Sequence, residues 1–143
     1  MPELSRRVQT FTDSVIRRMT RISDEVDAIN LSQGFPDFPP PKAITDRLRE
    51  VADEGPHQYS VTFGAENFRE ALARKQGRAY GREINPDTEI LVTCGGTEAM
   101  MSAMMTVCNP GDKVIVFSPF YENYGADAIL SGADPIFVPL VPP

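Results

Sequence analysis

The stretch "EILVTCGGTEAMMSAMM", from Glu89 to Met105, decides the fold because a short apolar run leads directly into a Gly-Gly-Thr turn. Residues 90–94 predict a buried strand, and residues from about 97 to 108 predict a helix. Both glycines of the turn allow positive φ, and the helix directs its free N–H groups at whatever lies in front. The turn either binds an anion such as a phosphate or only closes a tight connection. The local sequence leaves both open, since neither the Walker pattern nor G-x-G-x-x-G is present.

The same alternation of strand and helix continues after this turn. Residues 114–117 and 136–140 predict two further strands, and residues 121–130 predict the helix between them, with "NPGD" and "SGAD" as turns. Strands that alternate with helices indicate an α/β fold with a largely parallel sheet, whose ligands bind at the C-terminal ends of the strands. In "FSPFYENY", Tyr121 and Tyr124 could cover a flat ligand at that end, whereas we expect Phe120 to pack in the core.

The first half of the chain is predicted to be helical with two interruptions. Apolar residues recur every three or four positions across residues 11–29, which predicts an amphipathic helix. The proline cluster in "INLSQGFPDFPPP" predicts a loop, after which Pro41 opens a helix that ends at Gly55. "HQYSVTFG" predicts an irregular link. The segment "AENFREALARKQGRAYG" predicts a helix that Gly81 terminates.

Composition excludes several classes of function. The 143 residues carry a net charge of −6, which argues against a nucleic-acid binder. The N-terminus has no apolar signal-peptide core and the chain has no apolar run near 18 residues, so we expect a soluble cytoplasmic protein without a membrane partner. Cys94, Cys108 and His57 are too scattered to predict a metal site or a disulfide. A chain of this length could bury a core of its own.

Five spaced motifs carry a family resemblance: "INLSQGFPDF", "HQYSVTFG", "ILVTCGGTEAM", "NPGDKVIVFSPFYENY" and "SGADPIFVPL". In this order and spacing the chain resembles the N-terminal part of class I/II aminotransferases, in the branch of the aspartate, kynurenine and methionine enzymes. The resemblance implies the N-terminal part of the three-layer α/β/α architecture of fold type I. It also implies the cofactor pyridoxal 5′-phosphate (PLP), amino acid and 2-oxo acid substrates, and a role in amino acid metabolism.

The resemblance also assigns roles to individual residues. Gly96 and Thr97 match the positions that bind the cofactor phosphate, and Tyr121 matches the aromatic ring that stacks on the pyridine ring. Tyr59 matches a tyrosine that reaches the phosphate of the neighbouring subunit, which implies a homodimer. Gly34 matches a glycine whose backbone faces the substrate carboxylate.

The residues that carry the family's chemistry have no match here. The family needs a lysine that forms a Schiff base with the cofactor and an acidic residue beside the pyridine nitrogen. Lys42, Lys75 and Lys113 do not match that lysine, so no catalytic residue is assigned. We therefore expect an inactive piece of a longer aminotransferase, with an arm and substrate loop in residues 1–40 and the first part of the large cofactor domain in residues 41–143. One alternative is a stand-alone, non-catalytic module for phosphate-ligand binding or for interaction with a partner. Another is a small nucleotide domain, which the missing glycine pattern disfavours.

Overall fold

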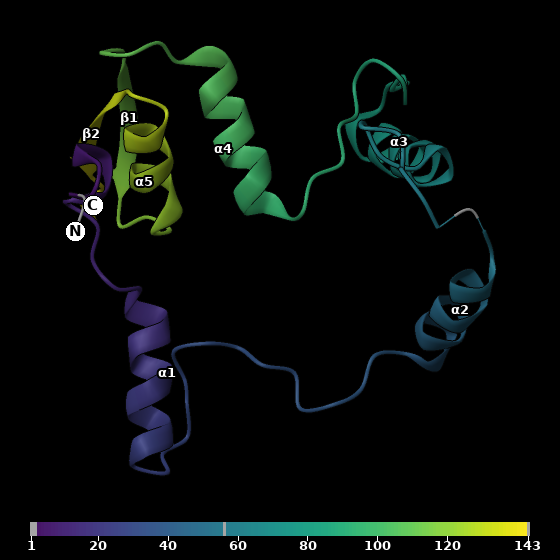
Figure 1. Cartoon of the computed structure of the whole chain (residues 1–143), viewed down its shortest axis with the longest axis horizontal. Helices are drawn as coiled ribbons and strands as arrows, with labels where there is room; N and C mark the ends of the chain where they lie inside the picture. Colours follow the sequence, from purple (N-terminus) through teal and green to yellow (C-terminus); the bar gives the residue numbers. More distant parts are fainter. Residues whose placement is uncertain (1–2, 56, 143) are drawn as a thin grey trace. The chain divides into compact units, whose positions relative to one another are not determined.

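The computed structural model describes residues 3–55 and 57–142, and Figure 1 labels its helices and strands along the chain. Contacts divide the chain into two units. One unit holds Asp13–Thr62, and the other holds the described residues up to Thr12 together with those from Phe63 onward. Each unit is described by itself below. No helix in the described ranges is long and apolar enough to cross a membrane.

The unit Asp13–Thr62 contains the helices α1 (Val15–Glu25) and α2 (Lys42–Asp53), joined by the proline-containing loop that the sequence predicted. The helix predicted for residues 11–29 is shorter at both ends. It begins at Val15 because the Ser14 side chain caps it by accepting the N–H of Arg17 at 3.4 Å. It ends at Glu25, just before Asp27 adopts a positive φ of 52°.

Helix α3 (Glu66–Tyr80) ends as predicted at Gly81, which adopts the left-handed conformation with φ 65°. Only a residue without a side chain adopts this conformation freely, so the position of the glycine sets the length of the helix. The apolar side chain of Phe68 is not buried by this helix, since it is 53% exposed. The residues that α3 buries are Arg69 and Ala73.

The C-terminal part of the chain forms a βαβ arrangement. Helix α4 (Gly96–Val107) precedes strand β1 (Lys113–Ser118), helix α5 (Asn123–Leu130) and strand β2 (Asp134–Pro139). The two strands are parallel, with a register that runs from Lys113 opposite Asp134 to Ser118 opposite Pro139. Helix α5 contacts both strands, α4 and the short helix η1 (Arg6–Val8), and Figure 1 shows it beside the strands. The predicted parallel order of these elements is therefore confirmed.

The strand predicted at residues 90–94 is not present. Within the described residues the sheet has only two strands, β1 and β2. Residues 90–94 make no ladder with them; the N–H of Val92 instead donates to the carbonyl oxygen of Phe63 at 3.0 Å. An apolar run becomes a strand only where a neighbouring strand pairs with its backbone groups. That partner is absent from the described part of the chain, so the prediction of this strand was wrong.

The core of the C-terminal part is small and one-sided. Its buried apolar residues are Val116, Ala128 and Ala133. Val116 and its register neighbour Phe137 lie on the face of the sheet that α5 covers. On the opposite face Ile115 is 63% exposed. The core within the described residues is therefore small, because helices cover only one face of this two-stranded sheet.

Candidate functional site

The candidate site is a cavity at the N-terminal end of α4. It has a volume of about 470 Å³ and is lined by residues of α4, of α5 and of the loop before α5, namely Gly96, Thr97, Met100, Tyr121, Asn123 and Tyr124. The structure therefore brings together three of the residues predicted to bind a cofactor: Gly96, Thr97 and Tyr121. This juxtaposition supports the prediction that the glycine turn and the aromatic segment face one ligand.

The Gly-Gly-Thr turn has the geometry of a helix N-terminus that is open to a ligand. Gly95 adopts φ 93° and ψ 174°, whereas Gly96 is already the first helical residue. Of the two glycines predicted to allow positive φ, only Gly95 uses it. A methyl group built on either glycine would meet no heavy atom within 4 Å. Within the described part of the chain no side chain caps α4, so its first N–H groups face an open space.

Asn123 joins the two helices at the cavity. Its Nδ2 donates a hydrogen bond to Oγ1 of Thr97 over 2.8 Å, although the two residues lie 26 positions apart. Asn123 is the first residue of α5 and Thr97 the second residue of α4. Two helix N-termini, each with a positive partial charge, therefore line one cavity. The sequence analysis quoted Asn123 within "FSPFYENY" but gave it no role, because nothing local to that motif indicates its partner.

The aromatic side chains divide between the cavity and the sheet. Tyr121 is 51% exposed and contacts Tyr124 edge to face, with the ring centroids 6.1 Å apart. Phe120 stacks on Phe137 with the centroids 5.0 Å apart. Phe120 therefore packs against Phe137 of the sheet but stays 38% exposed, so the expectation that it lies in the core was wrong. Tyr121 keeps a ring surface available beside the turn.

One acidic side chain lies close to the turn. The carboxylate of Glu98 accepts the backbone N–H of Cys94, one residue before Gly95. An acidic residue in the first turn of a helix stabilises it through the helix dipole. Because this carboxylate is bonded on the Cys94 side of the turn, the N–H groups of Gly96 and Thr97 remain for an anion.

The remaining predicted site residues belong to the other unit. Tyr59 is fully exposed and has a φ of 21°, and Gly34 has open space around the position of a side chain. Both residues lie within Asp13–Thr62, outside the unit that holds the cavity. Their assigned roles stay predictions.

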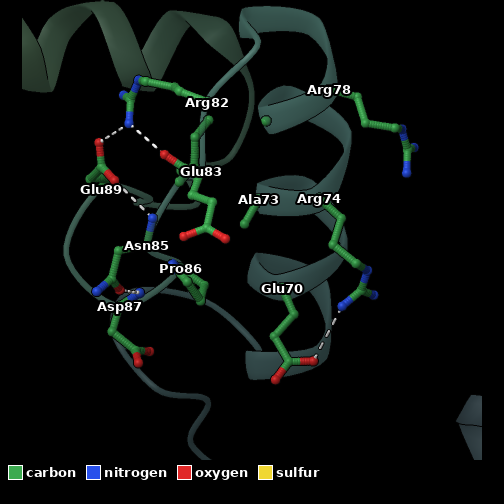
Figure 2. A pocket seen from close by; sticks show the side chains of 12 residues that line it. Glu70, Ala73, Arg74, Arg78, Arg82, Glu83, Asn85, Pro86, Asp87 and Glu89 are labelled. Carbon is green, nitrogen blue, oxygen red and sulfur yellow. Dashed lines mark hydrogen bonds and ion pairs between the residues drawn. The ribbon is translucent and has the colours of Figure 1, made fainter.

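A larger cavity of about 840 Å³ lies between α3 and residues 82–89 (Figure 2). Two ion pairs join charged residues of its lining, Arg74 with Glu70 and Arg82 with Glu89. Arg82 contacts Glu89 at 2.8 Å, and the other carboxylate oxygen of Glu89 accepts the N–H of Asn85 at 2.8 Å. The Asn85 hydrogen bond and the Arg82 guanidinium together hold the pKa of Glu89 below its ordinary value. These interactions hold Arg82, Asn85 and Glu89 in place without a ligand, and we do not assign this cavity a binding role.

Comparisons with known proteins all indicate the same family. The family model described as aminotransferase class I and II matches residues 26–143. The methionine aminotransferase of Escherichia coli (strain K12) is 38% identical over 130 residues, which is 91% of this chain and 34% of that protein. The probable N-succinyldiaminopimelate aminotransferase DapC of Mycobacterium tuberculosis is 34% identical over 136 residues, covering 95% of this chain and 34% of that protein.

The structural comparison agrees. The crystal structure of YbdL from Escherichia coli, identified as a methionine aminotransferase, superposes with a TM-score of 0.91 and 35% identity. The match covers all of this chain and 37% of that one. This likeness confirms the predicted fold, the N-terminal part of the fold type I architecture. The chain spans about a third of the length of the relatives that it matches.

Proposed function

The chain belongs to the class I and II aminotransferase family, and from this membership we propose that it is part of a PLP-dependent aminotransferase. The complete enzyme would move an amino group between an amino acid and a 2-oxo acid. The observation that carries the proposal is the cavity in which Gly96, Thr97 and Tyr121 meet. Because the chain spans about a third of its relatives, the activity belongs to the complete natural polypeptide.

The residues at the cavity fit the cofactor. The N–H groups of Gly96 and Thr97, together with the Thr97 hydroxyl, would hold the phosphate, and the ring of Tyr121 would lie against the pyridine ring. The support for this assignment is the uncapped start of α4 and the open space in front of the two glycines. When bound, PLP supplies an electron sink that stabilises negative charge on the substrate's Cα.

Two further roles belong to the same proposal and rest on the family resemblance. The backbone of Gly34 would face the substrate carboxylate. The hydroxyl of Tyr59 would reach the cofactor phosphate held by a second copy of the chain, so the enzyme would be a homodimer. The full exposure of Tyr59 leaves its hydroxyl available for such a contact. A cytoplasmic location also stays a prediction from the sequence.

We further propose that this chain is not catalytic by itself. Among the described residues that line the cavity, none is a lysine. Lys113 begins β1, whereas the cavity is lined by residues that follow the other end of this strand, so the length of the strand separates the two. Lys42 and Lys75 lie on α2 and α3. The lysine and the acid that act on the substrate would come from the rest of the polypeptide.

The test uses the complete natural polypeptide, supplied with PLP, a panel of amino acids and a 2-oxo acid. We expect a visible absorption band from bound PLP and transfer of the amino group. Replacing Thr97 with valine removes one hydroxyl from the cavity and should weaken binding of the phosphorylated cofactor about tenfold or more. Thr106→Val is the matched control, because the Thr106 hydroxyl bonds to Ser102 O within α4 at 2.7 Å. Phosphate-dependent binding without amino transfer would instead favour the non-catalytic binding module.

A further inference from the structure

We propose that Asn123 is a positioning residue that orients the hydroxyl of Thr97 so that its proton faces a bound phosphate. The inference rests on the proposed function of the cavity and assigns a role to a residue that the family resemblance does not. Its basis is the 2.8 Å hydrogen bond from Nδ2 of Asn123 to Oγ1 of Thr97. Both residues line the same cavity.

The direction of this hydrogen bond decides what the hydroxyl can do. A threonine hydroxyl has one proton to donate and two lone pairs that accept. The amide N–H of Asn123 occupies a lone pair, so the proton of Thr97 remains available to another acceptor. An anion in the cavity is such an acceptor, and a hydrogen bond to a charged group is stronger than one between neutral groups.

The position of Thr97 in its helix keeps that proton free. Other threonines donate their hydroxyl to a carbonyl one turn earlier, as Thr20 does to Ile16 at 3.1 Å and Thr106 does to Ser102 at 2.7 Å. Thr97 is the second residue of α4, and no helical turn precedes it. The local backbone therefore offers no equivalent helical acceptor, and the hydroxyl is left for the cavity.

The neutral side chain of Asn123 suits this role better than an acidic one. Two helix N-termini meet here, and a carboxylate at position 123 would add negative charge where a phosphate is expected. A carboxylate also has no proton to donate, so it would accept the Thr97 proton and turn it away from the anion. Asn123→Asp therefore reverses the hydrogen bond, whereas Asn123→Ala only removes it.

The experiment uses the complete natural polypeptide and pyridoxamine 5′-phosphate, whose amine cannot link covalently to a lysine. The dissociation constant of pyridoxamine 5′-phosphate is measured for the wild type and for Asn123→Ala, Asn123→Asp and Thr97→Val. It is also measured for the two double variants that combine Thr97→Val with each Asn123 substitution. We expect Asn123→Ala to bind about threefold to tenfold more weakly and Asn123→Asp to bind about thirtyfold more weakly. The effect of Asn123→Ala should disappear in the Thr97→Val background, because the hydroxyl that it orients is gone.

Two controls separate orientation from charge and from general damage. Asn67→Asp makes the same charge change at the second residue of α3 and should leave binding unaltered. Pyridoxamine without its phosphate should bind equally to the wild type and to Asn123→Ala. If Asn123→Asp does not fold, the double-mutant cycle of Asn123→Ala and Thr97→Val still tests whether Asn123 acts through the Thr97 hydroxyl.

The outcomes distinguish this inference from the proposed function. A wild-type protein that does not bind pyridoxamine 5′-phosphate would overturn the proposed function, and the inference with it. A wild-type protein that binds it while Asn123→Ala binds equally well would overturn the inference alone. An effect of Asn123→Ala that persists undiminished in the Thr97→Val background would also overturn it, since Asn123 would then act without the hydroxyl.

Discussion

The guanidinium of Arg69 donates a hydrogen bond from Nε to the backbone carbonyl of Gly64, with 3.0 Å between the two atoms. Its Nη1 donates to the carbonyl of Pro86 at 2.7 Å and to a carboxylate oxygen of Asp87 at 2.6 Å. Arg69 is only 6% exposed. One buried side chain therefore ties the segment before α3 to the loop that leads toward the Gly-Gly-Thr turn.

Replacing Arg69 with methionine should destabilise this region by about 3 kcal/mol, because two backbone carbonyls lose a charged hydrogen-bond donor. Hydrogen exchange of residues 82–92 and the thermal midpoint of the complete natural polypeptide measure the effect. Arg74→Met is the matched control on the same helix. Arg74 is exposed and lies 3.7 Å from Glu70, so its loss should cost less than about 0.5 kcal/mol. Equal effects of the two substitutions would contradict the role of Arg69.

Gly64→Ala should be strongly destabilising, by about 2 kcal/mol or more. Gly64 has a φ of 104°, and a methyl group there would lie 2.6 Å from Cβ of Val92. Gly55→Ala is the control, since a methyl group at Gly55 meets nothing within 4 Å. The double variant Gly64→Ala with Val92→Ala should recover only part of the loss, because it removes the overlap with Cγ2 of Val92 but keeps the close contact with Cβ and the backbone strain. Thermal denaturation of the four proteins tests this order.

Asp127→Asn should stabilise the protein at pH 7. Asp127 is 3% exposed, and among the described residues its Oδ2 has no hydrogen-bond partner. Burial raises the pKa of Asp127 above its ordinary value. The folded state therefore holds this proton more tightly than the unfolded state. Stability falls as the pH rises from about 4, the unfolded pKa, through the folded pKa.

The advantage of Asp127→Asn should accordingly disappear below about pH 4, where the wild-type carboxyl is protonated in both states. Thermal midpoints measured from about pH 3 to about pH 7 give the comparison. Asp24→Asn removes the same charge from an exposed position of α1 and should change the midpoint little. An Asp127→Asn variant that is less stable than the wild type at pH 7 would show that the carboxylate has a stabilising partner in the complete protein.

Replacing Gly95 or Gly96 with alanine should affect the stability of the protein differently from its binding of a phosphorylated ligand. Gly95→Ala forces a side chain into a backbone with φ 93° and should cost about 1 to 3 kcal/mol. Gly96→Ala places alanine in the first turn of a helix and should leave stability equal or slightly higher. Both variants should bind pyridoxamine 5′-phosphate more weakly. A destabilised Gly96→Ala protein with unchanged binding would argue against a phosphate at this backbone.

Much of the local structure could be predicted from the sequence because its causes are local. Gly81 ends α3 in the left-handed conformation, and Gly111 and Gly132 provide the positive φ of the turns before β1 and β2. These effects depend on one residue and its own backbone. The parallel order of β1 and β2 also followed from the sequence, since a helix between two strands leaves few other connections.

The candidate site was predictable in part. The sequence placed the glycine turn and the aromatic segment at the same end of the predicted sheet, and both do line one cavity, although the strand predicted before the glycine turn is not formed. The hydrogen bond between Asn123 and Thr97 was not predictable, because it depends on how α4 and α5 pack.

The sequence by itself determined that helices form in these segments, that α3 ends at Gly81 and that β1 and β2 run parallel, because glycines and apolar periodicity act within a few residues. Only the tertiary structure decided that residues 90–94 lack a ladder, that Arg69 is buried and that Asn123 reaches Thr97. Strand pairing, the burial of a charge and a hydrogen bond between helices each need a partner that is distant in the sequence. The chemical nature of one residue does not identify that partner.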